Sequence, residues 1–269
     1  MRLYVATCRE LPEVDVDEQP LREALAAAGI DATWQAWDDP AADWDGPTLL
    51  RSTWNYSLHL AAFLSWIDRL PVVWNPADIV RGNVRKRYLL ELAVRGVPVV
   101  PTQLVEPGQR AEVRARSVIK PEVGAGSLDA RVFEAGDPEI AAHVARIHAR
   151  CAALVQPYVA SVHDYGERSV VWIDGELTHE IRKTPRFSGD VEKIDGPYPI
   201  ADDEREVAFA ALAPYAERIL YGRVDLARDA SGHPMVMELE LVEPSLFFAR
   251  HPPALERYLA GLRRRLELT

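Results

Sequence analysis

The stretch YGRVDLARDASGHPMVMELELVE, residues 221–243, decides the fold of this chain. Two apolar runs flank Asp229-Ala-Ser-Gly232, and turn-forming residues between such runs predict an antiparallel hairpin. Side chains along a strand alternate between its two faces, so Glu238 and Glu240 share one face. Asp225 on the partner strand can lie opposite them, because cross-strand neighbours face the same side. The pattern therefore gathers three carboxylates on one face of a hairpin.

Three carboxylates on one face repel one another unless a cation lies between them. Oxygen ligands with open water positions suit Mg²⁺ or Mn²⁺ when the ion bridges the phosphates of a nucleotide. The alternative is a solvated acidic face, but the other face of the same strand is apolar and predicts a sheet that packs on one side. That apolar face carries Met235, Met237, Leu239 and Leu241. We therefore expect a metal site at Asp225, Glu238 and Glu240.

A lysine followed by a glycine-containing turn marks a second stretch, VIKPEVGAGS at residues 118–127. Lys120 ends a predicted strand and can neutralise phosphate. Gly124 and Gly126 let backbone N–H groups, including that of Ser127, approach phosphate oxygens closely. The alternative is an ordinary hairpin turn.

The chain uses lysine sparingly, since only four of its 31 basic residues are Lys. A chain that prefers Arg keeps Lys where a compact, flexible point charge works better than a planar fork. Compositional drift is the other interpretation of this bias. The four positions are Lys86, Lys120, Lys183 and Lys193.

Between the glycine turn and the hairpin lies LVQPYV at residues 154–159, an apolar strand interrupted by proline. A proline in a strand exposes unpaired backbone groups, which can read the edge of an adenine. The candidate contacts are Gln156, Pro157, Tyr158 and Val159. Glu167 follows, and Arg182 and Lys183 close the next predicted strand.

The first 75 residues alternate strands with helices, which predicts a parallel sheet covered by helices. Six of the seven tryptophans lie there, and most of them suit core or interface packing. Trp54 is different, because RSTWNY at residues 51–56 ends a predicted strand, and ligands of open α/β sheets bind beyond strand ends. The expected substrate contacts are Arg51, Ser52, Trp54 and Asn55.

After residue 76 the pattern changes to short strands and separate helices. Residues 185–199 contain Pro and Gly without periodicity and predict a long mobile loop, a common form of lid. Helices are predicted over residues 83–95, 138–150, 203–220 and 253–268. Strands are predicted over residues 117–120, 130–134, 153–158, 169–173 and 176–182.

Composition argues against several classes of protein. The 41 acidic and 31 basic residues give a net charge of −10, which disfavours a grip on a nucleic-acid backbone. No apolar run approaches the roughly 20 residues that span a bilayer, and no signal peptide is evident. Cys8 and Cys151 form no CxxC motif, so neither a disulfide framework nor a thiolate metal site is expected.

The P-loop, GxGxxG, HExxH and serine-elbow motifs are missing. We expect a cytoplasmic enzyme or binding protein of two or three lobes.

The order of these features resembles the ATP-grasp superfamily over residues 75–247. That order runs from a helix lysine, Lys86, through the lysine–glycine turn, hinge strand, acidic residue and basic strand end to Arg223 and the three carboxylates. The resemblance implies a fold of α/β and α+β parts, with ATP between two α+β lobes. It implies a parallel α/β lobe at residues 1–80, a small central lobe at 81–160 and a carboxy-terminal lobe at 161–269 that holds the metal.

The resemblance also implies a role for each site residue. Lys86 and Lys120 correspond to two phosphate-contacting lysines, residues 156–159 to the adenine hinge, and Glu167 to a contact with the ribose or purine. The implied chemistry is phosphorylation of a carboxylate to an acyl phosphate, which an amine then attacks.

Arg223 corresponds to the arginine that holds the transferring phosphoryl group and the developing oxyanion. Lys120, Arg182 and Lys183 complete the implied catalytic set, and Asp225, Glu238 and Glu240 occupy the magnesium-ligand positions. Glu240 departs from many relatives, which have Asn there, so the extra charge can tighten metal binding or shift the ligand set.

Four short stretches are similar to one branch, the D-cycloserine synthetase-like ligases. This similarity implies an ADP-forming ligase of antibiotic biosynthesis that cyclises an amino-acid-like substrate of the O-ureido-serine type. Glu243 and Ser245 would then hold the ammonium or nitrogen end of that substrate. The stretches are RSTWNY at 51–56, WNP at 74–76, KRYLL at 86–90 and ELELVEPSLF at 238–247.

Two other functions stay open at this point: an intermolecular ligase that joins an amino acid to an amine or peptide, and a non-catalytic nucleotide-binding protein. Lys120, Arg223 and the carboxylates count against the second, because ATP binding alone does not require phosphoryl-transfer groups. The expected partner is a small carboxylate substrate, with neither nucleic acid nor membrane. The sequence leaves open the stereochemistry of the substrate, the number of metal ions and the oligomeric state, a homodimer included.

Overall fold

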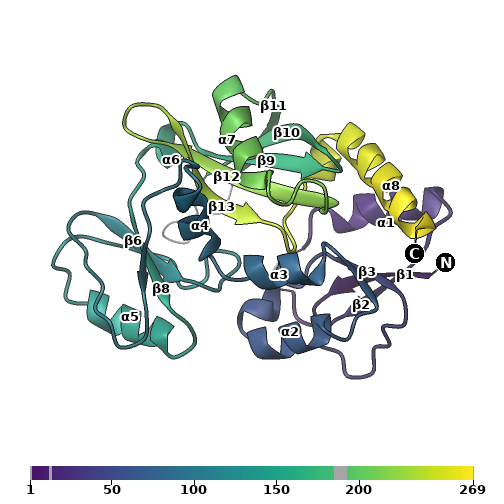
Figure 1. Cartoon of the computed structure of the whole chain (residues 1–269), viewed down its shortest axis with the longest axis horizontal. Coiled ribbons are helices and arrows are strands. Elements are labelled where there is room, and N and C mark those ends of the chain that lie inside the picture. The colour runs from purple at the N-terminus through teal and green to yellow at the C-terminus, as the bar shows by residue number, and fades with distance from the viewer. Residues whose placement is uncertain (1, 12–13, 185–192, 269) are drawn as a thin grey trace.

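The computed structural model describes residues 2–11, 14–184 and 193–268. Within these residues the strands form three sheets, which occupy three parts of an elongated molecule, with both termini at one end (Figure 1). One sheet is parallel and two are antiparallel, as expected for a fold of α/β and α+β parts. In the described part of the chain, no helix is long and apolar enough to cross a membrane.

The amino-terminal sheet is parallel, in the order β2-β1-β3-β4. Leu3 and Val5 of β1 pack against Leu21 and Leu25, which form the apolar face of α1. On the other side Phe63 of α2 packs among tryptophans, so most Trp side chains serve the core, as predicted. The bounds are β1 (Arg2–Thr7), α1 (Glu18–Ala27), β2 (Asp31–Ala36), β3 (Pro47–Leu50), η1 (Trp54–Ser57), α2 (Leu60–Ile67) and β4 (Val72–Trp74).

The central sheet is antiparallel, in the order β5-β8-β6-β7. Val144 and Ile147 of α5 pack on Ile119 and Val155, which closes a small separate core. Strand β6 carries Lys120 near its end. The bounds are β5 (Gln103–Val105), β6 (Ser117–Pro121), β7 (Arg131–Phe133), α5 (Ile140–His148) and β8 (Ala153–Pro157).

The carboxy-terminal sheet is antiparallel, in the order β11-β10-β9-β12-β13. One face packs against α7 and α4, and the other packs against α8 and the amino-terminal part, so the sheet is covered on both sides. The bounds are α3 (Ala77–Asn83), α4 (Tyr88–Val94), α6 (Ser161–Asp164), β9 (Glu167–Ile173), β10 (Glu176–Lys183), β11 (Ile194–Tyr198), α7 (Asp202–Leu212), β12 (Tyr221–Arg228), β13 (Pro234–Glu240), η2 (Phe248–Arg250) and α8 (Pro252–Glu267).

Three predicted elements differ from the structure. The helix expected over residues 83–95 is interrupted, and Lys86 lies between α3 and α4, where its N–H donates to the backbone oxygen of Glu122 at 2.9 Å. The helix expected over residues 203–220 ends at Leu212. Strand β11 falls inside the range predicted as a loop, and residues 185–192 of that range lie outside the described residues.

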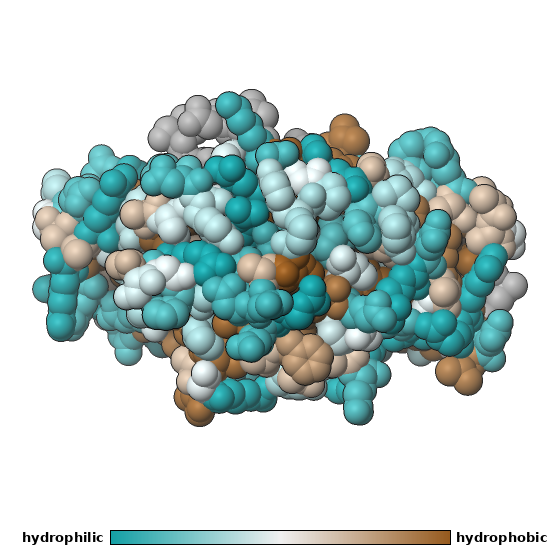
Figure 2. Space-filling view, turned by 90° about the horizontal axis from the view of Figure 1, so that it is seen from above, coloured by the Kyte–Doolittle hydropathy of each residue, from teal (hydrophilic) through white to brown (hydrophobic). Residues whose placement is uncertain are grey.

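The surface seen from above is mostly hydrophilic, with apolar residues in small separate patches (Figure 2). Exposed large apolar side chains include Leu58, Val94 and Phe209. Scattered apolar residues are ordinary on a protein surface. The unusual feature of this molecule is a set of buried charged groups on the carboxy-terminal sheet.

Candidate active site

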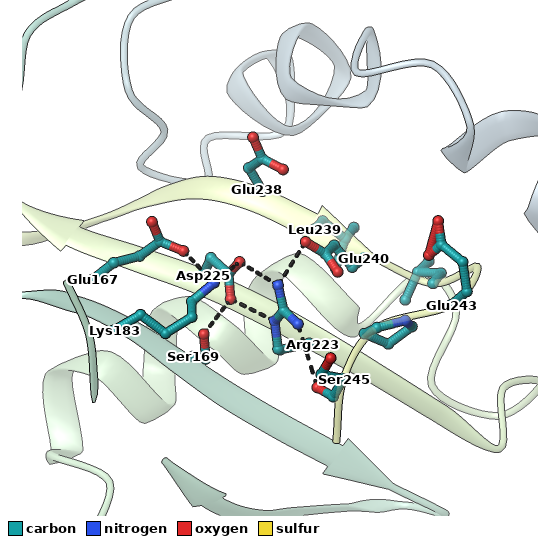
Figure 3. Close-up of polar contacts among 12 residues, drawn as sticks. Glu167, Ser169, Lys183, Arg223, Asp225, Glu238, Leu239, Glu240, Glu243 and Ser245 are labelled. Carbon is teal, nitrogen blue, oxygen red and sulfur yellow. Dashed lines mark hydrogen bonds and ion pairs between the residues drawn. The ribbon is translucent and has the colours of Figure 1, made fainter. Parts of the chain in front are cut away.

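The β12–β13 hairpin places its charged residues on one face. Arg223 pairs with Glu240 in register, and Asp225 pairs with Glu238. Directly opposite residues in an antiparallel pair point to the same side. The face predicted from the sequence therefore carries all three carboxylates and the arginine (Figure 3).

Arg223 and Asp225 form the centre of the cluster. Arg223 donates from Nε and Nη2 to the two Asp225 oxygens at 2.7 and 2.8 Å, and from Nη2 to Glu240 Oε1 at 2.6 Å. Asp225 also accepts from Ser169 Oγ at 2.7 Å and Lys183 Nζ at 2.9 Å. Burial alone would raise the pKa of Asp225, but Arg223 and Lys183 lower it well below its ordinary value. Asp225 is therefore a carboxylate at neutral pH.

Lys183 joins Glu167 to this centre, because its Nζ lies 2.5 Å from Glu167 Oε1. Burial raises the pKa of Glu167 to about 7, with Asp225 adding to the rise and Lys183 opposing it. Arg182, the neighbour of Lys183 on β10, points elsewhere and donates to the backbone oxygen of Asp164 at 2.7 Å. The structure thus brings Lys183 and Glu167 to the cluster and leaves Arg182 outside it.

Two lysines from different parts of the chain meet at Glu238. Lys86 Nζ lies 2.8 Å from Glu238 Oε2, and Lys120 Nζ lies 2.7 Å from Glu238 Oε1. Burial would raise the pKa of Glu238, but the two lysines lower it far below its ordinary value. The structure therefore places side by side the two lysines that the sequence singled out.

The carboxylates offer the oxygen ligands that a divalent cation takes, yet each is now paired with a cationic side chain. Asp225 already accepts four hydrogen bonds, which fills its acceptor sites. Among the described residues, no three His, Cys, Asp or Glu side chains converge as a metal site. The carboxylate oxygens of Glu238 and Glu240 have the chemistry that such an ion takes. The metal assignment stays a prediction.

The glycine turn and the hinge lie in the central part. Gly126 and Ser127 are exposed and both have φ of +59°, a conformation that glycine adopts freely. Gln156 is buried and donates from Nε2 to Thr102 Oγ1 at 2.9 Å, while Pro157 still pairs in register with Ser117. Tyr158 lies under the Arg116 guanidinium, 4.2 Å from the ring centroid, and Val159 is half-buried.

The expected substrate residues after β3 are mostly engaged with the protein itself. Arg51 is buried and donates from Nη2 to Asp17 Oδ2 at 3.2 Å and to the Pro244 oxygen at 3.0 Å. Ser52 Oγ lies 2.9 Å from Thr7 Oγ1. Asn55 accepts from Trp37 Nε1 at 2.6 Å and donates to Asp38 Oδ2 at 2.8 Å. Trp54 is half-buried, and its Nε1 donates to the Glu243 backbone oxygen at 3.4 Å. It therefore borders the segment that carries Glu243 and Ser245.

The segment after β13 carries Glu243 and Ser245. Arg223 Nη1 donates to the Ser245 backbone oxygen at 3.3 Å, so this segment borders the cluster (Figure 3). Burial raises the pKa of Glu243 to about 8, Glu240 adds to the rise, and Lys86, Arg223 and the Tyr56 hydroxyl oppose it. A carboxyl group with a pKa of about 8 exchanges its proton close to neutral pH.

The sequence did not single out four residues that shape this site: Asp17, Tyr56, Glu122 and Ser169. Asp17 accepts the backbone N–H of Leu246 at 2.5 Å although 229 positions separate them, and a contact at that separation leaves no local pattern. Ser169 lies on β9 directly opposite Asp225 in register, which a strand prediction alone does not reveal. Glu122, two positions after Lys120, and Tyr56, at the end of RSTWNY, do lie within stretches that the sequence analysis singles out.

Solved structures with a similar fold are ATP-grasp ligases. The structure of D-alanine–D-alanine ligase from Bacillus anthracis with ATP superposes with a TM-score of 0.67 at 16% identity, covering 100% of both chains. The ATP-grasp ligase PsnB superposes with a TM-score of 0.63 at 18% identity, covering 96% of this chain and 98% of that chain. These two likenesses show the fold, and the predicted fold class is confirmed.

A narrower relationship comes from the sequence. The chain is 35% identical over 284 positions to the cycloserine biosynthesis protein DcsG of Streptomyces lavendulae, covering 94% of this chain and 95% of that protein. The crystal structure of D-cycloserine synthetase DcsG superposes with a TM-score of 0.89 at 34% identity, covering 99% of this chain and 100% of that chain. Residues 3–75 match the family described as "D-cycloserine synthetase DcsG, N-terminal domain". The chain belongs to the DcsG family.

Family membership confirms that the chain is an enzyme that forms carbon–nitrogen bonds with ATP. This family membership argues against the alternative of a non-catalytic nucleotide-binding protein. The three sheets lie within the ranges predicted for the three domains, but the domain boundaries and the roles of individual residues stay predictions.

Proposed function

We propose that this enzyme is an ADP-forming ligase of cycloserine biosynthesis that closes a ring in a small substrate of the O-ureido-serine type. Membership of the DcsG family supports the substrate class. The observation that carries the chemistry is the convergence of Lys86 and Lys120 on Glu238, beside Arg223. Cationic side chains that neutralise phosphate charge, together with carboxylates that can hold a divalent cation, suit the transfer of a phosphoryl group.

In this proposal the charged pairs of the site exchange partners when ATP binds. Lys86 and Lys120 turn from Glu238 to the phosphates, and the turn at Gly124, Gly126 and Ser127 contributes backbone N–H groups. Glu238 and Glu240, with Asp225, then hold a divalent cation, Mg²⁺ or Mn²⁺, which would neutralise phosphate charge. Residues 156–159 read the adenine, and Glu167 contacts the ribose or purine.

The reaction runs in two steps. A carboxylate oxygen of the substrate attacks the γ-phosphorus of ATP, the bond to ADP breaks, and an acyl phosphate forms. The substrate's own nitrogen then attacks the acyl carbon, loses a proton, and inorganic phosphate leaves. Arg223 stabilises charge on the phosphoryl group and on the carbonyl oxygen, with Lys120 and Lys183 beside it. Because nucleophile and electrophile belong to one molecule, effective concentration replaces a second binding pocket.

The substrate lies between the amino-terminal part and the segment after β13. Glu243 and Ser245 hold its nitrogen end, with Trp54 beside them. Arg51, Ser52 and Asn55 shape this wall, since their side chains are engaged with the protein. We propose that the enzyme works in the cytoplasm on a small molecule, in three domains at residues 1–80, 81–160 and 161–269.

ADP release measured with a panel of amino-acid-like carboxylates, each with and without added amines, tests the ligase activity. We expect ADP with a small zwitterionic carboxylate and only background ADP without one. ADP formation at an equal rate with every carboxylate, or with none, would contradict a carboxylate-activating ligase.

A further inference from the structure

Glu122 is a buried carboxylate that links the segment of Lys86 to the strand that carries Lys120. Its side chain is 0% exposed, although it follows the strand-end Lys120 by two positions. Its oxygens contact Arg87 Nε, Arg87 Nη2 at 3.3 Å and Arg85 Nη1 at 3.3 Å. These two arginines flank Lys86 in the sequence. The Glu122 carboxylate, which follows the central strand β6, therefore binds the two residues on either side of Lys86.

The backbone of Glu122 makes the same connection. The N–H of Lys86 donates to the Glu122 oxygen at 2.9 Å, and the N–H of Glu122 donates to the Ala152 oxygen at 2.9 Å. Residues 84–87 lie between α3 and α4 and belong to neither helix. The junction that carries Lys86 is thus fastened to the central sheet through Glu122, by main chain and side chain together.

The contacts of Glu122 bear on the distance between the two lysine ammonium groups. Lys86 Nζ and Lys120 Nζ reach the two oxygens of Glu238 at 2.8 and 2.7 Å, so one small anionic group spans both. The two lysines start from different elements, a helix junction and strand β6, whose positions relative to each other depend on contacts such as those of Glu122. Arg87 also pairs with Glu106 at 2.9 Å, which anchors the same junction at its outer side.

We propose that Glu122 is a positioning residue that sets the separation of the Lys86 and Lys120 ammonium groups and thereby the affinity for the phosphates of ATP. This inference rests on the proposed role of those lysines in binding ATP. The Glu122 carboxylate is engaged by two arginines. It acts through Arg85, Arg87 and the Lys86 main chain.

The test is Glu122→Gln, which keeps the shape of the side chain and removes the charge that holds the guanidinium groups. We expect the KM for ATP to rise about tenfold while kcat changes less than about twofold, since the catalytic groups stay in place. Calorimetric binding of ATP in the absence of divalent cation should weaken by a similar factor, because the lysine contacts do not need the metal.

Arg87→Gln provides the same test without a buried substitution, because the Arg87 side chain is 42% exposed. We expect a smaller rise in the KM for ATP, and in the double variant an effect less than the product of the single effects, since both changes break one contact. The matched control is Arg131→Gln, which removes an equally exposed partner of Glu139 in the same part of the chain and should leave ATP affinity unchanged.

The outcomes separate this inference from the proposed function. If the wild-type enzyme binds no ATP and Lys120→Ala changes nothing, the proposed function fails. If the wild-type enzyme binds ATP and both Glu122→Gln and Arg87→Gln bind it equally well, the positioning role fails. Loss of stability in Glu122→Gln with unchanged ATP affinity in folded Arg87→Gln would likewise overturn it, because Glu122 would then serve only folding.

Discussion

Arg51 donates to the carboxylate of Asp17 at 3.2 Å, and their side chains are 3% and 0% exposed. The same carboxylate accepts the backbone N–H groups of Leu246, Phe247 and Phe248, and Arg51 also donates to the oxygen of Pro244. The pair therefore connects the amino-terminal part to the segment that carries Glu243 and Ser245. Arg51, which the sequence predicts to contact substrate, thus holds the segment that borders the site.

Arg51→Ala should therefore reduce stability strongly. Removing one partner of a buried ion pair leaves the other charge buried, which typically costs about 3–5 kcal/mol. The free energy of unfolding in urea measures this change. The control is Arg218→Ala, whose exposed pair with Asp78 should contribute about 0–1 kcal/mol. Equal, small losses in both variants would show that the Asp17 pair does not fix the segment.

The sequence predicted most strands and helices because their apolar periodicity matches the faces they bury. It failed where tertiary contacts override local preference. The backbone of Lys86 bonds to Glu122, and that contact accompanies a break in a segment whose pattern is helical throughout. Strand β11 completes the edge of a sheet, and its glycine- and proline-containing sequence carries no strand signal.

The site was predicted where chemistry and strand alternation coincide. Arg223, Asp225, Glu238 and Glu240 share one face because they alternate along paired strands. The family resemblance named Arg182 together with Lys183, but adjacent residues on a strand point to opposite faces, and only Lys183 contacts Asp225. Asp17 and Glu122 act through contacts distant in sequence, which periodicity does not reveal.

Lys120→Ala should weaken binding of ATP. Loss of a charge-assisted contact costs about 1.5–3 kcal/mol, which corresponds to roughly a 10- to 150-fold rise in the dissociation constant. Calorimetric titration with ATP measures it. Lys193→Ala removes another of the four lysines from an exposed position and serves as the control. Near-wild-type affinity and turnover in Lys120→Ala would remove Lys120 and the glycine turn from the site.

The raised pKa of the buried Glu180 predicts that the stability of the protein depends on pH. Glu180 and Glu204 are buried together, with Arg168, Tyr165 and Arg228 as neighbours, and each has an oxygen without a hydrogen-bond partner among the described residues. Burial raises the pKa of Glu180 from 4.5 to about 8, Glu204 adds to the rise, and Arg168 opposes it. Between those values the folded state keeps a proton that the unfolded state releases, so the free energy of unfolding falls as pH rises.

Glu180→Gln should flatten that fall, because the amide cannot titrate. Unfolding measured in urea from pH 5 to pH 9 gives the slope for the variant and the wild type. Glu176→Gln, at the exposed start of the same strand, is the control and should keep the wild-type slope. Identical slopes in all three proteins would contradict a protonated Glu180.

Turnover should depend on a divalent cation and on Glu238. Excess chelator should abolish ADP formation, and added Mg²⁺ should restore it. Glu238→Gln should lower turnover about a hundredfold and should depress turnover more than stability, whereas the exposed Glu217→Gln should leave turnover unchanged. Full activity in excess chelator would refute the metal assignment.

Ring closure is the central claim, and product analysis with one substrate tests it most directly. The enzyme is given ATP, Mg²⁺ and an O-ureido-serine type substrate with no added amine, and ADP and products are quantified together by chromatography and mass spectrometry. We predict one ADP for each molecule of a product that contains a new ring. Product formation that strictly requires a separate amine would contradict cyclisation and identify an intermolecular ligase.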